Sequence, residues 1–172
     1  IRDSSLSMFP NININDRVLV LKDKLFDIEY SVGDVIVFYS PESSSPNNSE
    51  LLIKNLKLWE LINNEGNKNQ TVYIKRIVGT PGDEISINKN GEVFNNNIQV
   101  ITENVASTVI LDDILIKLSD DEYFVLGDNR DNSFDSRSFG PITSSRMIGN
   151  GFFNIYPLDP VSYTHLRAHE TG

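Results

Sequence analysis

Two residue types that often carry chemistry are scarce or absent in this chain of 172 residues, which has no cysteine and only two histidines. The absence of cysteine excludes thiol proteases, disulfide scaffolds and cysteine-ligated zinc sites. Both histidines, His165 and His169, lie in the last eight residues. That position disfavours a Ser-His-Asp triad and a histidine-rich metal site. Any base that activates a nucleophile is therefore expected to be another residue type.

The sequence also lacks a long apolar run and an excess of basic residues. No run of about 18 apolar residues occurs, so no segment is expected to span a membrane, and none has the pattern of a signal peptide. The net charge of −9 argues against nucleic acid as a partner, because phosphate binding needs a basic face. Since the first residue is Ile1 and not methionine, we expect a fragment or a trimmed chain.

Short runs of β-branched and aromatic residues, bounded by glycine or polar residues, indicate a mainly β protein. Segment 84–100 alternates around Asn90-Gly91, a pair typical of the two-residue type I′ turn, and is predicted to form a hairpin. The other predicted strands are 16–21, 33–39, 72–78, 122–127 and 151–157.

Three segments depart from this pattern. Residues 41–50 are a polar loop rich in serine and proline. Residues 51–62 carry their apolar side chains roughly on one helical face and predict one short amphipathic helix. Residues 41–71 are therefore expected to be a surface insertion, with a peripheral membrane or partner contact as the alternative. The tail, 161–172, has no strand or helix pattern and is expected to be disordered or non-native.

The first candidate site is the segment SLSMFP, residues 5–10, just before the first predicted strand. Its two serines, Ser5 and Ser7, are separated by one residue. One hydroxyl can attack a substrate while the other, together with a backbone N–H, faces the developing oxyanion. The alternative is a plain serine-rich turn.

The second candidate is Lys75, which interrupts an apolar strand. Its neighbours on the same face are Tyr73 and Ile77, and Arg76 lies on the other face. Burial of an ammonium is costly unless it is paired or loses its proton, and desolvation lowers the lysine pKa from its ordinary value of about 10.4. Lys75 is therefore a reasonable general base. The alternative is an edge-strand lysine whose ammonium reaches water.

The third candidate is the segment GDNRDNSFDSRSFGP, residues 127–141, where aspartates and arginines alternate with serines and asparagines. This spacing allows Asp–Arg forks to hold the loop and leaves hydroxyls free to orient a neighbour. A calcium loop that starts at Asp131 would place Ser136 where glycine is needed and Ile142 where glutamate is needed. A charged, solvated turn is the remaining alternative.

The kinds and order of four boxes, SLSMFP, GDVIVF, KRIVGTPGD and GDNRDNSFDSRSFG, resemble the bacterial type I signal peptidases, with features similar to cyanobacterial and plastid members. The resemblance extends over residues 4–159, and the last box is highly specific. It implies that Ser7 is the nucleophile and Lys75 the general base. Ser5 is implied to join the Ser7 N–H in an oxyanion hole, and Ser133 to orient the lysine. Ile74 is implied to line the substrate cleft, and structural support is implied for Met8, Arg76, Asp128, Arg130, Asp135 and Arg137.

The resemblance also implies a mainly β fold: an antiparallel catalytic core of signal peptidase type, formed by 1–83 and 122–160, with a small inserted β region at 84–121. The implied activity is that of an endopeptidase that removes N-terminal signal peptides from exported preproteins after small residues, in an Ala-x-Ala pattern, without a metal or organic cofactor. The implied partners are preprotein signal peptides and the membrane surface, the latter through an anchor missing from this chain. The catalytic domain is expected on the extracytoplasmic side, in the periplasm or thylakoid lumen.

Several positions depart from the family pattern. Ser4 and Leu6 stand where proline and glycine are usual, Asn11 stands where threonine is usual, and Pro160 replaces a basic residue. None of these changes removes an implied catalytic group. Two rival functions are a repressor-type Ser-Lys autopeptidase, which an acidic chain without a DNA-binding region disfavours, and a non-catalytic β binding module, including a calcium-dependent one.

Overall fold

The computed structural model describes residues 6–14, 16–22, 29–42, 71–105 and 108–155. Over this part of the chain the protein is mainly β, and its strands pair antiparallel, so the predicted fold class is confirmed. The helix predicted at 51–62, most of the insertion 41–71, the tail 161–172 and Ser5 lie outside the described residues. No helix of the described part is long and apolar enough to cross a membrane.

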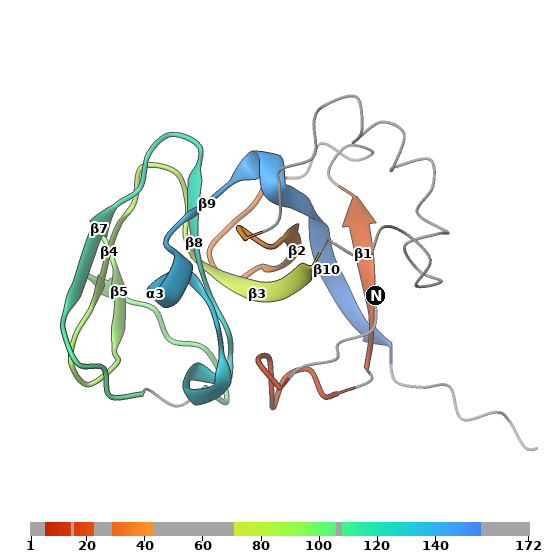
Figure 1. The fold of residues 1–172 in the computed structure, drawn as a ribbon, viewed down its shortest axis with the longest axis horizontal. Helices are drawn as coiled ribbons and strands as arrows, with labels where there is room; N and C mark the ends of the chain where they lie inside the picture. The colour runs from red at the N-terminus through yellow and green to blue at the C-terminus, as the bar shows by residue number, and fades with distance from the viewer. Residues whose placement is uncertain (1–5, 15, 23–28, 43–70, 106–107, 156–172) are drawn as a thin grey trace, which may run out of the picture.

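The larger of two sheets has six strands in the order β1-β10-β2-β3-β8-β9 (Figure 1). β3 lies in its interior, between β2 and β8. β2 is a continuous apolar run, VIVFY, and most residues of β2 and β3 are buried, as is typical of strands packed on both faces. The strands of this sheet are β1 (Arg17–Lys22), β2 (Val35–Tyr39), β3 (Val72–Gly79), β8 (Glu122–Leu126), β9 (Ile142–Thr143) and β10 (Met147–Ile155).

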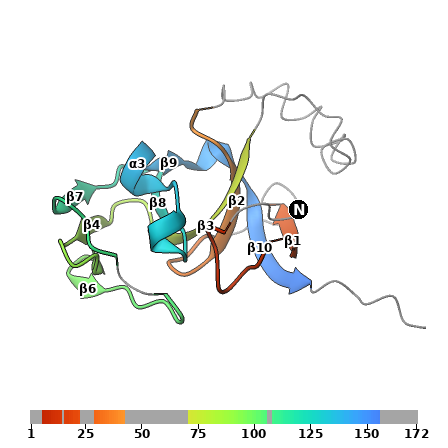
Figure 2. The same cartoon turned by 60° about the horizontal axis from the view of Figure 1, so that its bottom comes forward.

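The smaller sheet has four strands in the order β6-β5-β4-β7. Figures 1 and 2 both show it on the β8 side of the larger sheet. Its strands all lie within 84–121, and the division of the chain into domains at these bounds stays a prediction. The strands are β4 (Glu84–Ile87), β5 (Val93–Asn95), β6 (Ile98–Gln99) and β7 (Ile114–Lys117).

The hairpin of β4 and β5 turns at Asn90-Gly91, as the sequence predicted, but this turn is not of type I′. Between β4 and β5 the chain makes a wider turn in which Gly91 N donates to the carbonyl of Asn88, and only Gly91 has a positive φ, 76°. The type I′ turn lies between β5 and β6, at Asn96 (φ 48°) and Asn97 (φ 65°). Asparagine tolerates this left-handed conformation, so the hairpin was predicted correctly and its turn type was not.

One apolar cluster joins the two sheets. Val78, Phe124 and Leu126 of the larger sheet pack in this cluster against residues of the smaller one. Because these side chains are buried from both sides, the two sheets share a core. The residues that the smaller sheet and its flanks contribute are Ile85, Ile87, Val93 and Leu118.

A four-residue helix, α3 (Ser136–Phe139), follows β8 in a segment where the sequence predicted only a loop (Figure 2). Asp135 caps its start by accepting from the Arg137 N–H, as expected of an aspartate at this position. The helix stops at Gly140, whose φ of 81° favours glycine. The short 3-10 turns η2 (Arg130–Asn132) and η3 (Ser144–Arg146) flank it.

Asp83 fixes the turn between β3 and β4 and generates a testable prediction. Its carboxylate accepts from Thr80 N (2.8 Å) and Thr80 Oγ1 (2.9 Å), from Asn95 Nδ2 (2.7 Å) and from Asn96 Nδ2 (2.8 Å). Burial alone would raise the pKa of Asp83, but the hydrogen bonds from Thr80, Asn95 and Asn96 outweigh it and lower that pKa below its ordinary value.

A carboxyl group whose pKa is lowered on folding stabilises the protein above its unfolded-state pKa, about 3.9, and this stability is lost as pH falls through the folded value. Asp83→Asn is therefore expected to lower the free energy of unfolding at neutral pH by about 1–2 kcal/mol, and the difference from wild type is expected to shrink in acid. Urea unfolding followed by circular dichroism at several pH values measures it. The exposed Asp113→Asn is the matched control; equal pH profiles for both variants would contradict the prediction.

Candidate active site

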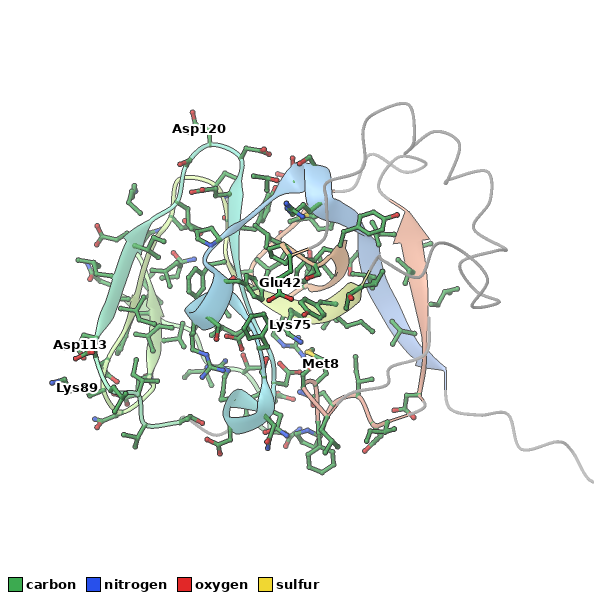
Figure 3. The ribbon with its side chains drawn as sticks, in the orientation of Figure 1. Met8, Glu42, Lys75, Lys89, Asp113 and Asp120 are labelled. Atoms are coloured by element: carbon green, nitrogen blue, oxygen red, sulfur yellow. The ribbon has the colours of Figure 1, made fainter. Side chains whose placement is uncertain are left out.

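The hydroxyl of Ser7 and the amine of Lys75 meet, although the two residues are 68 positions apart: Lys75 Nζ lies 2.7 Å from Ser7 Oγ. Ser7 belongs to a turn ahead of β1, closed by a hydrogen bond from Phe9 N to Leu6 O. Figure 3 shows Met8 and Lys75 side by side, between the smaller sheet and β10. The serine segment and the lysine strand therefore form one site.

Lys75 is buried although it carries an amine: only 3% of the residue is exposed, and Ser7 is 5% exposed. It lies on the interior strand β3, opposite Ile36 of β2. Its Nζ also donates to the Ile74 carbonyl, 3.0 Å away, and stands 5.5 Å from the centre of the Tyr73 ring. This interior position excludes the edge-strand alternative.

Met8 anchors the serine turn in the core. It is fully buried and packs with Ile74, Ile12, Val18 and Val37. Thus Ser7 faces Lys75 while the next side chain holds the turn in an apolar cluster. Ile74 is itself only 6% exposed. Its carbonyl contacts Lys75, and its implied place in the substrate cleft stays a prediction.

Gly127 lets the loop after β8 approach the serine closely. A Cβ at this position would lie 2.1 Å from Ser133 Oγ and 2.5 Å from the Ser7 carbonyl oxygen, so no other residue fits without a shift. Beside it, Asn129 N donates to the Ser7 carbonyl over 3.0 Å. The glycine of the last box therefore serves close approach, because its φ is not in the left-handed region.

Asp128 ties three segments together. Arg76 grips its carboxylate with two nitrogens, Nε to Oδ1 at 2.8 Å and Nη2 to Oδ2 at 2.7 Å, and also donates through Nη1 to the Gly33 carbonyl at 2.7 Å. Asn11 Nδ2 donates to the same carboxylate at 2.8 Å. The Asp128 side chain is 1% exposed, so these donors offset the cost of burying its charge. Asn11, treated in the sequence as a departure from a family pattern, thus links the serine segment to the aspartate.

Asp135, further along the same loop, also holds its surroundings together through hydrogen bonds. Arg137 binds it through Nε and Nη2, both at 2.9 Å, and the backbone N–H of Gly127 donates to it at 3.0 Å. Arg137 Nη2 also donates to the carbonyl of Arg130 at 2.7 Å. The Asp135 side chain is fully buried. It therefore fixes Gly127, the residue that the serine turn must approach.

Arg130 is the third arginine of this loop and is 8% exposed. Its Nε donates to the Gly127 carbonyl at 3.0 Å. Burial and then the positive charge of Arg137 lower the pKa of Arg130, against the opposing charges of Asp135 and Asp128. The guanidinium therefore braces the loop from the side of the smaller sheet, where it lines a cavity of about 90 Å³.

Ser133 is not connected to Lys75 by a hydrogen bond among the described residues. Its Oγ is buried and has no hydrogen-bond partner in that part of the chain, and it lies against Gly127. The orienting role implied for Ser133 stays a prediction. Ser5, the other implied oxyanion residue, lies outside the described residues.

The geometry does not favour the calcium alternative. Within the described residues no group of three or more His, Cys, Asp or Glu side chains could hold a metal ion. The two buried carboxylates of the loop, Asp128 and Asp135, are engaged by Arg76 and Arg137. An arginine already stands where a cation would have to bind.

Comparison with known proteins places this geometry in a family. The family model described as "Signal peptidase, peptidase S26" matches residues 1–156. A signal peptidase I of Leptolyngbya laminosa is 31% identical over 156 residues, which are 90% of this chain and 67% of that protein. A probable signal peptidase I-2 of Synechocystis sp. (strain ATCC 27184 / PCC 6803 / Kazusa) is 30% identical over 157 residues, 91% of this chain and 62% of that protein.

A thylakoidal processing peptidase 1, chloroplastic, of Arabidopsis thaliana is 29% identical over 160 residues, 93% of this chain and 42% of that protein. The chain thus spans from under half to about two thirds of the length of these relatives. Because the family model covers all the described residues, and the buried Ser7–Lys75 pair lies within it, the chain belongs to the signal peptidase family, peptidase S26.

Proposed function

We propose that this protein is a serine endopeptidase that removes N-terminal signal peptides from exported preproteins, with Ser7 as nucleophile and Lys75 as general base. The observation that carries the proposal is the 2.7 Å contact between Lys75 Nζ and Ser7 Oγ inside a buried site. Family membership and the names of the similar proteins support the substrate class. We infer cleavage after small residues, in an Ala-x-Ala pattern.

In the proposed reaction the neutral amine of Lys75 takes the proton of the Ser7 hydroxyl as Oγ attacks the carbonyl carbon before the scissile bond. The tetrahedral oxyanion is stabilised by the Ser7 N–H and, in our proposal, by the Ser5 hydroxyl. Collapse of this intermediate breaks the C–N bond, and the Lys75 ammonium returns its proton to the leaving amine. Lys75 then activates water, which releases the acyl group from Ser7.

The proposed partners are preprotein signal peptides and a membrane surface. Three large apolar side chains on the segment that carries Ser7 are close to half exposed: Leu6 (47%), Phe9 (46%) and Ile14 (45%). Apolar surface beside the nucleophile suits contact with an apolar signal peptide or with lipid. We further propose that the site faces the extracytoplasmic side of the membrane, in the periplasm or thylakoid lumen.

Removal of either reacting side chain tests the proposal. Ser7→Ala and Lys75→Ala are each expected to lower kcat/KM for a peptide with an Ala-x-Ala cleavage site by about a thousandfold or more, because neither the attack nor the proton transfer can then occur. Cleavage is followed by mass spectrometry, which also identifies the bond cut. The exposed Ser144→Ala and Lys89→Ala are matched controls. Retained cleavage by either active-site variant would refute the assignment.

The proposed base also predicts the pH dependence. Because only the neutral amine can accept the Ser7 proton, kcat/KM is expected to rise with pH in proportion to the neutral fraction of Lys75. A histidine-based protease would instead reach its plateau near pH 7, above the ordinary histidine pKa of about 6.5. Initial rates at low substrate concentration between about pH 5 and pH 10, from the lowest pKa documented for a buried lysine to near that of a free one, measure the profile. A flat profile would count against a lysine base.

A further inference from the structure

Four aromatic rings gather beside the reacting pair, and only one of them is largely exposed. Phe38 is fully buried, whereas Phe134 is 46% exposed. Phe134 packs edge-to-face on Phe139, with ring centres 5.4 Å apart, and Phe139 stacks on Tyr73 at 6.3 Å. The ring centre of the buried Phe38 lies 6.0 Å from that of Tyr73 and 6.3 Å from that of Phe139. The cluster is therefore anchored in the core and reaches the surface at Phe134.

This cluster adjoins the reacting atoms through Tyr73. Tyr73 and Lys75 share one face of β3, since side chains alternate along a strand, and the Tyr73 ring centre lies 5.5 Å from Lys75 Nζ. The same ring lies 6.4 Å from the ring of Phe134 in an edge-to-face arrangement. Tyr73 thus lies next to both Phe134 and the proposed base.

The backbone on both sides of Phe134 is held firmly. On one side, Asp135 is fixed by Arg137 and by the Gly127 N–H. On the other side, the Ser133 side chain lies against Gly127. Because the loop is anchored on both sides and Phe139 supports the ring, Phe134 presents its exposed face in a defined position. A rigid apolar surface near a nucleophile is what shapes a substrate subsite.

We propose that Phe134 is a specificity-determining residue, whose exposed ring forms an apolar wall of the substrate cleft and limits the size of a substrate side chain next to the scissile bond. This inference rests on the proposed function of the Ser7–Lys75 pair. A bulky substrate side chain meets the ring and is rejected, whereas a small one fits beside it. Shortening Phe134 opens this space.

The experiment compares Phe134→Ala with wild type on a set of peptides. The parent peptide has alanine at positions −3 and −1, and three derivatives each carry leucine at −3, −1 or +1. The readout is the ratio of kcat/KM for each leucine peptide to that for the parent peptide. We expect Phe134→Ala to raise this ratio at least at one position by about tenfold or more, which is the usual scale for steric discrimination in an apolar pocket.

Two further variants of Phe134 and one control variant separate an effect on specificity from an effect on structure. Phe134→Tyr keeps the ring and is expected to keep the wild-type ratios, whereas Phe134→Leu is expected to raise them partly. Leu111→Ala removes a side chain that is 93% exposed in the smaller region and is expected to leave every ratio unchanged. Thermal unfolding of each variant shows whether it is folded, and if Phe134→Ala does not fold, the comparison of the leucine and tyrosine variants decides.

Unchanged ratios at all three positions in folded Phe134 variants would overturn the inference, even if the parent peptide is cleaved normally. A uniform loss of activity on every peptide, with unchanged ratios, would also overturn it, because that result indicates a purely structural role. Failure of the proposed function is a different result: wild type would then cleave none of the peptides, or Ser7→Ala would cleave them as well as wild type does.

Discussion

The contact between Lys75 and Ser7 requires a buried amine and a distant serine to be held together, and much of the structure serves this purpose. Burying a lysine on an interior strand, where only 3% of it is exposed, is costly unless its amine has partners, and one of these partners, Ser7, must be brought from 68 residues away. The chain does so with a buried methionine. Met8 anchors the serine turn in an apolar cluster, and Ser7 consequently faces the amine. The same burial suits the role of general base that we propose for Lys75.

The second requirement is precision, and two buried carboxylates provide it. Buried ion pairs are weak evidence of stability, because desolvation offsets much of their attraction. Their value at this site is geometric. Asp128 accepts from Arg76 on β3 and from Asn11 just after the serine turn, while Asp135 holds the backbone of Gly127. Together they fix the loop against which the serine turn lies, where Asn129 N donates to the Ser7 carbonyl.

Most strands and the pairing of Ser7 with Lys75 could be predicted from the sequence because their signals are local or eliminative, whereas the short strands β7 and β9 were not predicted. Short runs of β-branched and aromatic residues indicated β2 and β3. Because histidine occurs only near the terminus, Lys75 was predicted as the base, and that role stays a prediction. The misses have other causes. The type I′ turn fell at Asn96 because several asparagine pairs in this region satisfy the same local rule. The helix α3 spans four residues, too few for a periodic pattern. The contact of Asn11 with Asp128 joins residues 117 positions apart, and no local pattern announces such a pairing.

The same loop that positions the serine also carries the aromatic ring nearest to solvent. Phe134 is flanked by Ser133, which packs on Gly127, and by Asp135, which binds the Gly127 N–H. A shift of this loop would therefore move both the Ser7 carbonyl contact and the ring of Phe134. In the proposed enzyme, the discrimination of a substrate side chain and the placement of the nucleophile depend on one rigid segment. A substrate that pushes Phe134 aside would disturb the alignment of Ser7 with Lys75, so the size of the bound residue would affect kcat as well as KM.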